Sequence, residues 1–468
     1  MSTAECLLSV QALSIRTQAE QVLLSDASLS LMRGQRLTIV GESGAGKSLL
    51  AQAIMGTLPK ELIASGSIHI AQHATHGKRH LTEPLWGHTV AMLPQEPWNA
   101  LSPLMRMGSQ VAESARYSKP CSWAQARQLA HEKMAQLGVA HASQQYLHQI
   151  SGGMAQRVGV AASTLGGADL LLADEPTKGL DEHSRGQVAQ LLLALQGADQ
   201  ALLTITHDLA LAVQLGGLLM VMQKGQVLEC GEVASVLQSP QHPYTQALIA
   251  AQPKHWAALV APLPQSPECV IQARGLAKSF GDRELFRAYD LSLSAGEIVA
   301  ISGPSGCGKT TLGNVLLGLL DADAGSINRR YALGKAYQKL YQDPPAAFAP
   351  QRTLGGALHD VARLHRLDTQ RIEPLMHELR LHPDLLDRLP AQVSGGELQR
   401  MALLRLLLVS PAFIFADEPT SRLDVITQHE TMKLLTRSAQ QQGCAVLLVS
   451  HDADLARASS HRHHAMLG

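Results

Sequence analysis

The chain has 468 residues, of which 46% are hydrophobic and 17% charged, so about two to four domains with sizeable apolar cores are expected. Lysine plus arginine and aspartate plus glutamate each number 39, and this balance argues against a general basic surface for nucleic acid. The six cysteines include no CxxC pair, which argues against a zinc or iron–sulfur site and suits a reducing compartment.

The N-terminal segment lacks the basic region and the apolar region of a signal peptide. No stretch approaches the roughly 18 consecutive apolar residues that a membrane-spanning helix needs. We therefore expect that, if this protein works at a membrane, other proteins hold it there.

Four segments of the first half recur in the same order in the second half. The pairs are GESGAGKS at 41–48 with GPSGCGKT at 303–310, ISGGMAQRV at 150–158 with VSGGELQRM at 393–401, LLLADEPTKGLD at 170–181 with FIFADEPTSRLD at 413–424, and TITHD at 204–208 with LVSHD at 448–452. The last three pairs keep an offset of 243 or 244 residues. A register this constant indicates a duplicated domain.

The repeat predicts one domain at 1–254 and a second, C-terminally short domain at 269–468. Between them, residues 255–268 contain three prolines and little periodic pattern, as expected of a linker. The first copy has 19 extra residues before its SGG motif, because its lysine and its SGG serine are offset by 262 and 243 from their counterparts. Part of this surplus falls at 66–88, which we expect to be a surface loop.

Secondary structure follows the repeated motifs in chain order. RLTIV and EIVAIS lead into the glycine-rich segments, and apolar residues every three to four then predict helices at 48–58 and 310–320. LLLAD, FIFAD, ALLTITH and AVLLVSH predict buried strands, and segments around 122–137 and 369–380 predict helical insertions. Strands that alternate with helices imply a mostly parallel sheet covered on both faces.

GxxxxGK[ST] between a strand and a helix is a phosphate-binding loop, whose backbone N–H groups make an anion nest. The lysine meets the β- and γ-phosphates and the last hydroxyl is a Mg²⁺ ligand. The loop residues are Gly41, Ser43, Gly44, Ala45, Gly46, Lys47 and Ser48 in the first copy, and Gly303, Ser305, Gly306, Cys307, Gly308, Lys309, Thr310 and Thr311 in the second. Two copies predict two sites for ATP and Mg²⁺.

A pair of acids ends an apolar strand in each copy. Asp174 and Asp417 are expected to support Mg²⁺. Glu175 and Glu418 come next, so their carboxylates point in another direction and are suited to polarising the attacking water. The two glutamates are therefore predicted to be catalytic.

With the phosphate loop, SGG, ADEPT and histidine in this order, nearly the whole chain resembles the ATP-binding-cassette (ABC) family. The resemblance implies an α/β fold of two P-loop NTPase domains, each with a mostly parallel sheet core, an antiparallel β subdomain and an α-helical signature subdomain. It also implies that the signature of one domain closes over the nucleotide of the other. The signature residues are Ser151, Gly152, Gly153, Ser394, Gly395 and Gly396.

The same resemblance assigns further roles. His207 and His451 match the switch histidine, which contacts the γ-phosphate and the catalytic water. Gln95 and Gln342 match the Q-loop glutamine, a ligand of Mg²⁺ or water that senses the partner subunit. Asp181 and Asp424 match the D-loop.

The two copies depart from the family differently at the adenine position, where an aromatic residue usually stacks on the base. Phe280 fits this role in the second copy, whereas the first copy has Ile15 or Arg16 there. Both glutamates and both histidines are nevertheless present. We expect both sites to hydrolyse ATP, with unequal surroundings.

Two segments point to the process that ATP drives. Residues 94–113 and 342–358 resemble the Q-loop region of peptide and nickel importer ATPases, and SPQHPYTQALIAAQP at 239–253 resembles the segment that closes those domains. The resemblance implies an importer of peptides, nickel or metal–metallophore complexes, with two transmembrane permease subunits and an extracytoplasmic substrate-binding protein. No nucleic-acid partner is expected, and the location is the cytoplasmic face of the inner membrane.

Other functions stay open. A soluble tandem ABC ATPase acting on ribosomes or DNA usually has a long charged linker, and the linker here is short and nearly uncharged. An ATPase of a phosphonate-breakdown complex and a sugar importer are further alternatives. His461, His463 and His464 invite a metal-binding interpretation, although a surface or frayed end is the expected explanation.

Overall fold

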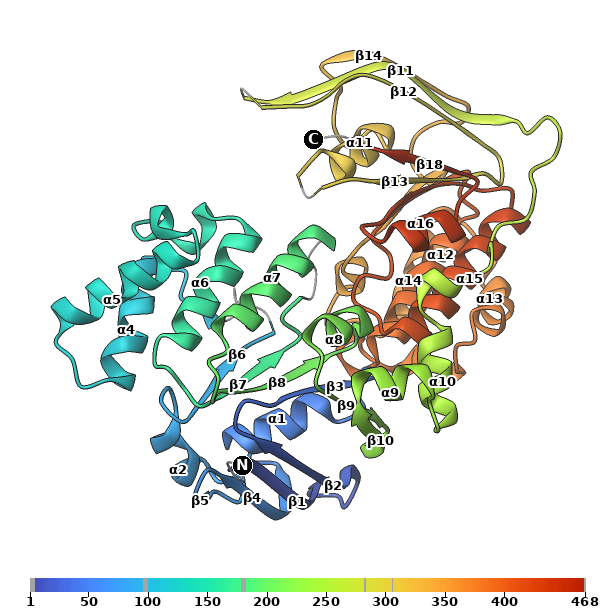
Figure 1. The fold of residues 1–468 in the computed structure, drawn as a ribbon. Helices are drawn as coiled ribbons and strands as arrows, with labels where there is room; N and C mark the ends of the chain where they lie inside the picture. Colours follow the sequence, from blue (N-terminus) through green and yellow to red (C-terminus); the bar gives the residue numbers. More distant parts are fainter. Residues whose placement is uncertain (1–4, 96–99, 178–181, 282, 305, 467–468) are drawn as a thin grey trace. The chain divides into compact units, whose positions relative to one another are not determined.

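The computed structural model describes residues 5–95, 100–177, 182–281, 283–304 and 306–466, which form two compact units, 1–249 and 250–468. We call them unit 1 and unit 2 and describe each by itself. Both are layered α/β structures with a parallel core sheet and a separate antiparallel sheet (Figure 1). The predicted fold class is therefore confirmed.

The core sheet of unit 1 has six strands in the order β10-β9-β3-β8-β7-β6. Its strands pair in parallel except β10, which pairs antiparallel with β9. The strands are β3 (Arg36–Gly41), β6 (Val90–Leu93), β7 (Leu170–Asp174), β8 (Ala201–Thr206), β9 (Leu218–Gln223) and β10 (Gln226–Glu232). Because β3, β7 and β8 are neighbours, their carboxyl ends bring the glycine-rich loop, the acids and the histidine to one edge.

A four-stranded antiparallel sheet and a group of helices complete unit 1. The sheet has the order β2-β1-β4-β5, and α4, α5 and α6 gather beside α7, away from that sheet (Figure 1). Its strands are β1 (Cys6–Thr17), β2 (Val22–Met32), β4 (Leu62–Ile70) and β5 (His73–Ala74). The helices are α1 (Lys47–Met55), α2 (Arg79–Thr82), α4 (Met107–Ser118), α5 (Trp123–Gln136), α6 (Gly152–Thr164), α7 (Glu182–Leu195), α8 (Leu209–Leu215), α9 (Val233–Gln238) and α10 (Pro243–Ala250).

Unit 2 repeats this arrangement with a five-stranded, wholly parallel sheet in the order β15-β16-β17-β13-β18 and an antiparallel sheet in the order β12-β11-β14. The strands are β11 (Cys269–Phe280), β12 (Arg283–Ser294), β13 (Ile298–Ser302), β14 (Ala324–Arg329), β15 (Tyr337–Leu340), β16 (Phe413–Asp417), β17 (Ala445–Val449) and β18 (Arg462–Ala465). The helices are α11 (Lys309–Leu316), α12 (Leu354–His365), α13 (Ile372–Glu378), α14 (Gly395–Leu408), α15 (Val425–Gln441) and α16 (Ala453–Ala458).

The sequence patterns explain most of these elements. FIFAD and AVLLV are buried at every position, as expected of central parallel strands covered on both faces. The helices after the glycine-rich loops are shorter than predicted, because α1 ends at Gly56 in a left-handed cap and α11 ends at Leu316. The expected surface loop at 66–88 is wrong in part, because it contains β5, α2 and a 3₁₀ turn that buries Leu85.

The predicted linker is not an unattached segment, because its first half packs on unit 2. The Trp256 ring stacks on His429 with centroids 4.5 Å apart, and Leu259 N–H donates to the Ala458 carbonyl over 2.7 Å. Gln440 exchanges two hydrogen bonds with the Ala261 backbone, at 3.2 and 2.9 Å. These contacts attach residues 256–261 to α15 and α16.

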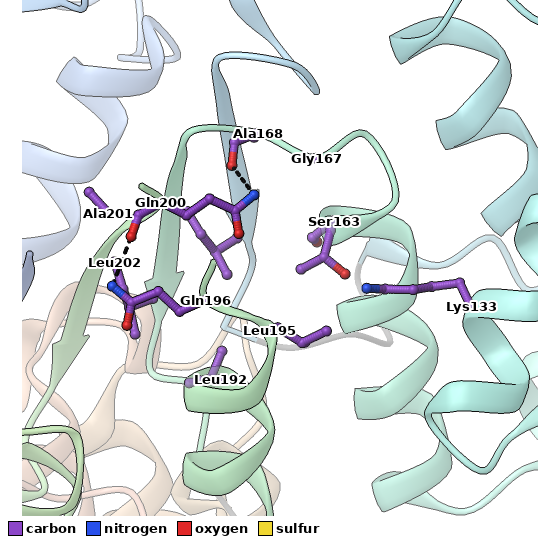
Figure 2. Close-up of a pocket in the computed structure, with 12 residues that line it drawn as sticks. Lys133, Ser163, Gly167, Ala168, Leu192, Leu195, Gln196, Gln200, Ala201 and Leu202 are labelled. Carbon is purple, nitrogen blue, oxygen red and sulfur yellow. Dashed lines mark hydrogen bonds between the residues drawn. The ribbon is translucent and has the colours of Figure 1, made fainter. Parts of the chain in front are cut away.

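The two units differ in packing behind the signature helices. In unit 1 a cavity of 240 Å³ lies between α5, α6 and α7, and Lys133 extends toward Ser163 across it (Figure 2). The matching turns after α5 and α13 share a hydrogen-bond pattern, which places Leu375 of unit 2 at the position of Lys133. Leu375 and Leu406, the latter at the position of Ser163, are buried in an apolar core. This region is thus apolar in unit 2 and partly polar and hollow in unit 1.

Candidate functional site

Each phosphate loop lies between a core strand and a helix, as its sequence predicts. Gly46 and Gly308 cap α1 and α11 with φ of 92° and 101°, a left-handed conformation that favours glycine. A Cβ on Gly41 would lie 2.1 Å from the Met222 carbonyl oxygen, and one on Gly303 would lie 2.5 Å from that of Met466. These loops therefore need glycine for backbone reasons alone.

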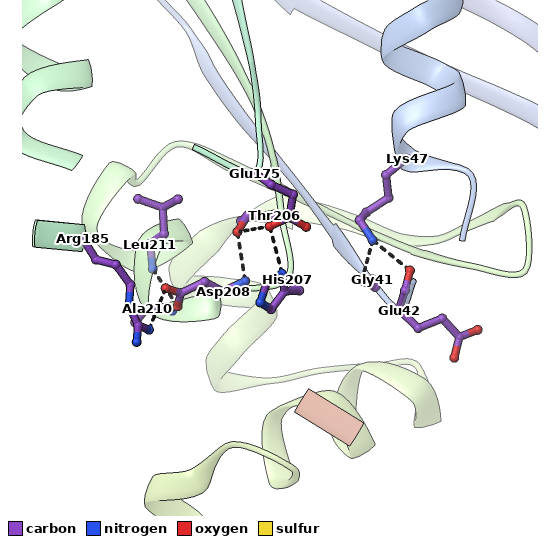
Figure 3. Close-up of polar contacts among 10 residues, drawn as sticks. All are labelled: Gly41, Glu42, Lys47, Glu175, Arg185, Thr206, His207, Asp208, Ala210 and Leu211. Carbon is purple, nitrogen blue, oxygen red and sulfur yellow. Dashed lines mark hydrogen bonds and ion pairs between the residues drawn. The ribbon is translucent and has the colours of Figure 1, made fainter. Parts of the chain in front are cut away.

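The loop lysines fold back over their own loops. Lys47 Nζ donates to the carbonyls of Gly41 and Glu42 at 2.7 and 2.8 Å (Figure 3). Lys309 Nζ does the same to Gly303 and Pro304 at 2.7 and 2.9 Å. An exposed hydroxyl, Ser48 or Thr310, follows each lysine. A buried ammonium at the start of a helix and a glycine-rich turn together fit a triphosphate.

The acid that is expected to support Mg²⁺ is buried in both units. In unit 2, Thr310 Oγ1 donates to Asp417 Oδ1 over 3.1 Å, so the hydroxyl and the carboxylate of the predicted Mg²⁺ ligands already lie together. Burial raises the pKa of the Asp417 carboxyl, and Lys339 and Thr310 counter this shift only in part. A Mg²⁺ ion fits this oxygen pair, and in unit 1 Ser48 and Asp174 have the matching places.

The residue at one strand position near this acid differs between the units, and in unit 2 it is a lysine. Lys339 Nζ lies 3.4 Å from Asp417 Oδ2 and also donates to Asn314 Oδ1 at 3.1 Å. Strand pairing puts Met92 of unit 1 at the same position, since Met92 pairs with Leu172 and Lys339 with Phe415. Sequence reasoning missed Lys339, because it lies in a strand that carries no repeated motif.

The predicted catalytic glutamates share an unusual backbone conformation. Glu175 and Glu418 have φ of 48° and 47°, in the left-handed region that costs a non-glycine residue free energy. Their N–H groups still donate across the sheet, to Ile205 and Val449. The chain therefore turns sharply after the strand, and the glutamate carboxylate is directed at the histidine of the neighbouring strand.

In unit 1 the Glu175 carboxylate meets the end of β8. Its Oε2 lies 2.8 Å from His207 Nδ1 and accepts from Thr206 Oγ1 at 3.4 Å (Figure 3). Burial alone would lower the pKa of His207, but the charge and hydrogen bond of Glu175 outweigh it and raise that pKa. Asp208 begins α8 by accepting from the N–H groups of Ala210 and Leu211 at 2.8 and 3.2 Å. A helix thus fixes the residue next to the histidine.

In unit 2 the Glu418 carboxylate has two side-chain partners. His451 Nε2 contacts Glu418 Oε1, and Gln342 Nε2 donates to Glu418 Oε2 at 2.8 Å. The structure thus gathers three of the predicted residues into one cluster. Gln95, the counterpart of Gln342, is half-buried beyond the end of β6. Ser305 and Asp181 lie outside the described residues.

The signature motifs begin helices in both units. Ser151 and Ser394 are the N-caps of α6 and α14, and their hydroxyls accept from the N–H groups of Met154 and Glu397 at 3.4 and 3.3 Å. Glu397 also accepts from Ser394 N–H at 2.9 Å, which completes a capping box in unit 2 alone. Gly152, Gly153, Gly395 and Gly396 follow in the first turns, so free N–H groups face outward there.

The expected adenine positions differ in what they expose. Phe280 is 54% exposed at the end of β11, and Lys278 Nζ lies 5.6 Å from its ring centroid. Ile15 is fully buried in the apolar core of unit 1, so its side chain is not available for stacking. Arg16 is exposed and ion-paired with Glu20 at 2.7 Å. Arg16 is therefore the side chain of this pair that remains accessible in unit 1.

The terminal histidines are held in structure rather than frayed. His461 Nδ1 accepts from Ile298 N–H at 3.0 Å, and His463 Nε2 lies 2.8 Å from Ser302 Oγ. Within the described ranges, no group of three or more His, Cys, Asp or Glu side chains is arranged to hold a metal. In the same ranges, every helix is too short or too polar to cross a membrane.

Comparisons with known proteins agree with this geometry. The ABC transporter family profile matches residues 24–178 and 286–421. The chain is 32% identical to an uncharacterized ABC transporter ATP-binding protein, YejF, of Escherichia coli K12, over 98% of this chain and 93% of that protein. It is also 32% identical to the glutathione import ATP-binding protein GsiA of Shigella dysenteriae serotype 1, over 97% of this chain and 84% of that protein.

Solved structures share the fold. The RNase-L Inhibitor has a TM-score of 0.66 at 20% identity, and 97% of this chain and 87% of that chain are covered. An archaeal ribosome recycling factor has the same TM-score and the same coverage at 21% identity. Since the family profile spans well over half of the sequence, in two copies, and full-length relatives are 32% identical, the chain belongs to the ABC transporter family and is a tandem ATPase of that family.

Proposed function

We propose that this chain is the ATP-hydrolysing subunit of an importer for small peptides of the glutathione kind. The observation that carries the proposal is that both units hold a glutamate against a strand-end histidine: the Glu175–His207 distance is 2.8 Å, and Glu418 contacts both His451 and Gln342. Two such clusters suit a protein whose two sites both turn over. The relation to a glutathione import protein along 97% of the chain supports the cargo class.

In this proposal the residues divide the work. Lys47 and Lys309 release their loop carbonyls and neutralise the nucleotide phosphates, while the loop N–H groups bind the same oxygens. Glu175 and Glu418 accept hydrogen bonds from the attacking water, and the histidines hold those carboxylates in place. Ser48, Asp174 and Gln95, with Thr310, Asp417 and Gln342, would hold Mg²⁺, which would offset the charge on the transferring phosphate.

Partners and location follow from the importer proposal. The chain would join two transmembrane permease subunits and an extracytoplasmic binding protein at the cytoplasmic face of the inner membrane. The pairing of each phosphate loop with the SGG motif of the other domain, and the adenine contact of Phe280, stay predictions. A nickel or metal–metallophore cargo stays an alternative to the peptide cargo of this proposal.

Uptake assays test the proposal. Cells that depend on this chain should take up labelled glutathione or dipeptides, and the pair Glu175→Gln with Glu418→Gln should abolish uptake while leaving the chain's abundance unchanged. Uptake that survives in the double variant would refute the importer function. Nickel uptake run in parallel would expose a metal cargo, and co-purification with ribosomes instead of permeases would favour the soluble alternative.

A further inference from the structure

Late segments of unit 1 return to its phosphate loop. In the turn between β9 and β10, Gly225 N–H donates to the Ala45 carbonyl over 3.2 Å. In α10, the Tyr244 hydroxyl accepts from Glu42 N–H over 2.9 Å. Tyr244 is only 7% exposed, although it lies 202 positions after Glu42 in the sequence. Two separate contacts thus tie the loop to residues that follow the last repeated motif.

The helix that presents Tyr244 is itself anchored. Glu229 of β10 accepts from the N–H groups of Gln241 and His242 at 2.9 and 3.2 Å, at the start of α10. Burial alone would raise the pKa of the Glu229 carboxyl, but the backbone hydrogen bonds from Gln241 and His242 outweigh burial and hold that pKa below its ordinary value. The contacts of Glu229 therefore fix the start of α10, and with it the position of the Tyr244 ring, independently of the phosphate loop.

In unit 2 a different contact holds the phosphate loop. The residue at the position of Glu42 is Pro304, which has no N–H to donate. Its loop is held instead by Arg283 of β12, whose guanidinium donates to the Gly306 carbonyl at 2.9 Å. The hydroxyl partner is thus found in the copy whose loop has an N–H to donate at this position, and the other copy has proline there.

We propose that Tyr244 is a positioning residue for the phosphate loop of unit 1, and that its hydrogen bond to Glu42 N–H raises nucleotide affinity at this site alone. A loop that is already held in the nest shape loses less conformational freedom when phosphate binds. Tyr244 does not touch the nucleotide in this proposal and acts through the backbone at Glu42. The inference rests on the proposed ATP-binding role of residues 41–48.

Site-specific titration tests the inference. In a Lys309→Ala background, where only the first site binds, Tyr244→Phe should weaken binding of a fluorescent ATP analogue about three- to tenfold, the effect of losing one hydrogen bond. In a Lys47→Ala background, which reports the second site, the same change should have no effect. Tyr289→Phe is the matched control, because the described residues offer its buried hydroxyl no partner.

A double-mutant cycle separates the hydrogen bond from packing. Glu42→Pro copies Pro304 and removes the donor, so Tyr244→Phe should then cost nothing further. The inference would be overturned if Tyr244→Phe weakened nucleotide binding equally with Glu42 and with Pro at position 42. It would also be overturned if Tyr244→Phe had no effect with either residue. If Glu42→Pro does not fold, hydrogen exchange at the Glu42 amide gives the same answer, because Tyr244→Phe should expose it.

A further variant distinguishes failure of the proposed ATP-binding role of residues 41–48 from failure of the Tyr244 role. Lys47→Ala in the Lys309→Ala background should abolish nucleotide binding. If binding survives that change, the phosphate-loop assignment fails, whatever Tyr244 does. If binding is lost there but Tyr244→Phe has no effect, only the positioning role fails.

Discussion

The two ATPase units of this chain have the same predicted catalytic residues with different neighbours. In unit 1 the glutamate meets one histidine and a threonine, and a tyrosine from α10 holds the phosphate loop. In unit 2 the glutamate meets a histidine and a glutamine, and an arginine from β12 holds the loop. Duplication has thus kept the predicted catalytic groups and changed the residues that contact them.

The difference extends to charge and packing. Asp417 has a lysine within 3.4 Å, where unit 1 has Met92. The signature helix of unit 2 begins with a capping box, which unit 1 lacks because Met154 stands in place of Glu397. Behind that helix unit 2 is packed with leucines, while unit 1 encloses a cavity. These contrasts predict that both sites work but respond differently to matched changes.

The largest expected effect comes from the glutamates. Each of Glu175→Gln and Glu418→Gln should reduce steady-state ATP hydrolysis by about two- to tenfold, because the other site still turns over. The double variant should fall by about 100-fold or more, the usual contribution of a general base. A single variant as inactive as the double one would break the comparison, since it would leave only one hydrolysing site.

The next effect concerns adenine. Phe280→Ala should weaken ATP binding at the second site by about tenfold, since a base stacked on an aromatic ring is worth roughly 1–3 kcal/mol. Arg16→Ala is the matched change in unit 1 and should cost less, because Arg16 already pairs with Glu20. Titrations in Lys47→Ala and Lys309→Ala backgrounds measure each site separately. Equal losses would show that Arg16 stacks as well as a phenyl ring does.

Much of this fold follows from residue types and spacing alone. The parallel core was predictable from LLLAD and FIFAD, since a strand apolar on both faces must be covered on both faces. The helical segments at 122–137 and 369–380 were predictable from their alanine- and leucine-rich composition, and α5 and α13 lie there. The segment at 66–88 was not, because its short elements depend on packing of Leu85 and Thr82 rather than on local pattern.

The candidate site was predictable where a motif carries it and not elsewhere. The repeat located Glu175 and His207 at the ends of two apolar strands, but the pairing of β7 with β8, the left-handed backbone of Glu175 and its contact with His207 come from the fold. Lys339 lies in no repeated motif, and the segment 239–253 that contains Tyr244 carried only a family resemblance. The contact of each residue spans a distance in sequence that only the fold closes. One comparison between the copies hints at a partner such as Tyr244: the loop position that is Glu42 in unit 1, with an N–H to donate, is Pro304 in unit 2.

A smaller effect should come from the cation beside Asp417. Lys339→Met places the residue of unit 1 in unit 2. It should raise the Mg²⁺ affinity of the second site about three- to tenfold, because a positive charge near the ion is removed. Met92→Lys is the reverse change and should lower the Mg²⁺ affinity of the first site. Magnesium titrations of nucleotide binding measure both, and a loss of Mg²⁺ affinity in Lys339→Met would contradict the role given to that lysine.

The smallest effect concerns packing behind the signature helix of unit 1 (Figure 2). Burial, with the charge of Lys119 adding to it, lowers the pKa of the Lys133 ammonium. A base whose folded pKa is lowered costs stability while both states are protonated, and this cost fades as pH rises from the folded pKa toward 10.5. Lys133 therefore destabilises unit 1 at neutral pH.

Lys133→Leu copies Leu375 of unit 2 and should stabilise unit 1 by about 0.5–2 kcal/mol at pH 7, because it removes a half-buried positive charge. Hydrogen exchange of α5 and α6 should slow, while exchange in α13 and α14 of unit 2 should stay unchanged as the internal control. The gain should shrink as pH rises toward about 10.5, because above that pH the lysine of the wild-type chain is neutral in both the folded and the unfolded state. Faster exchange in α6 at pH 7 would mean that the ammonium has a stabilising partner there, and that this part of unit 1 differs from unit 2 for a functional reason rather than through weaker packing.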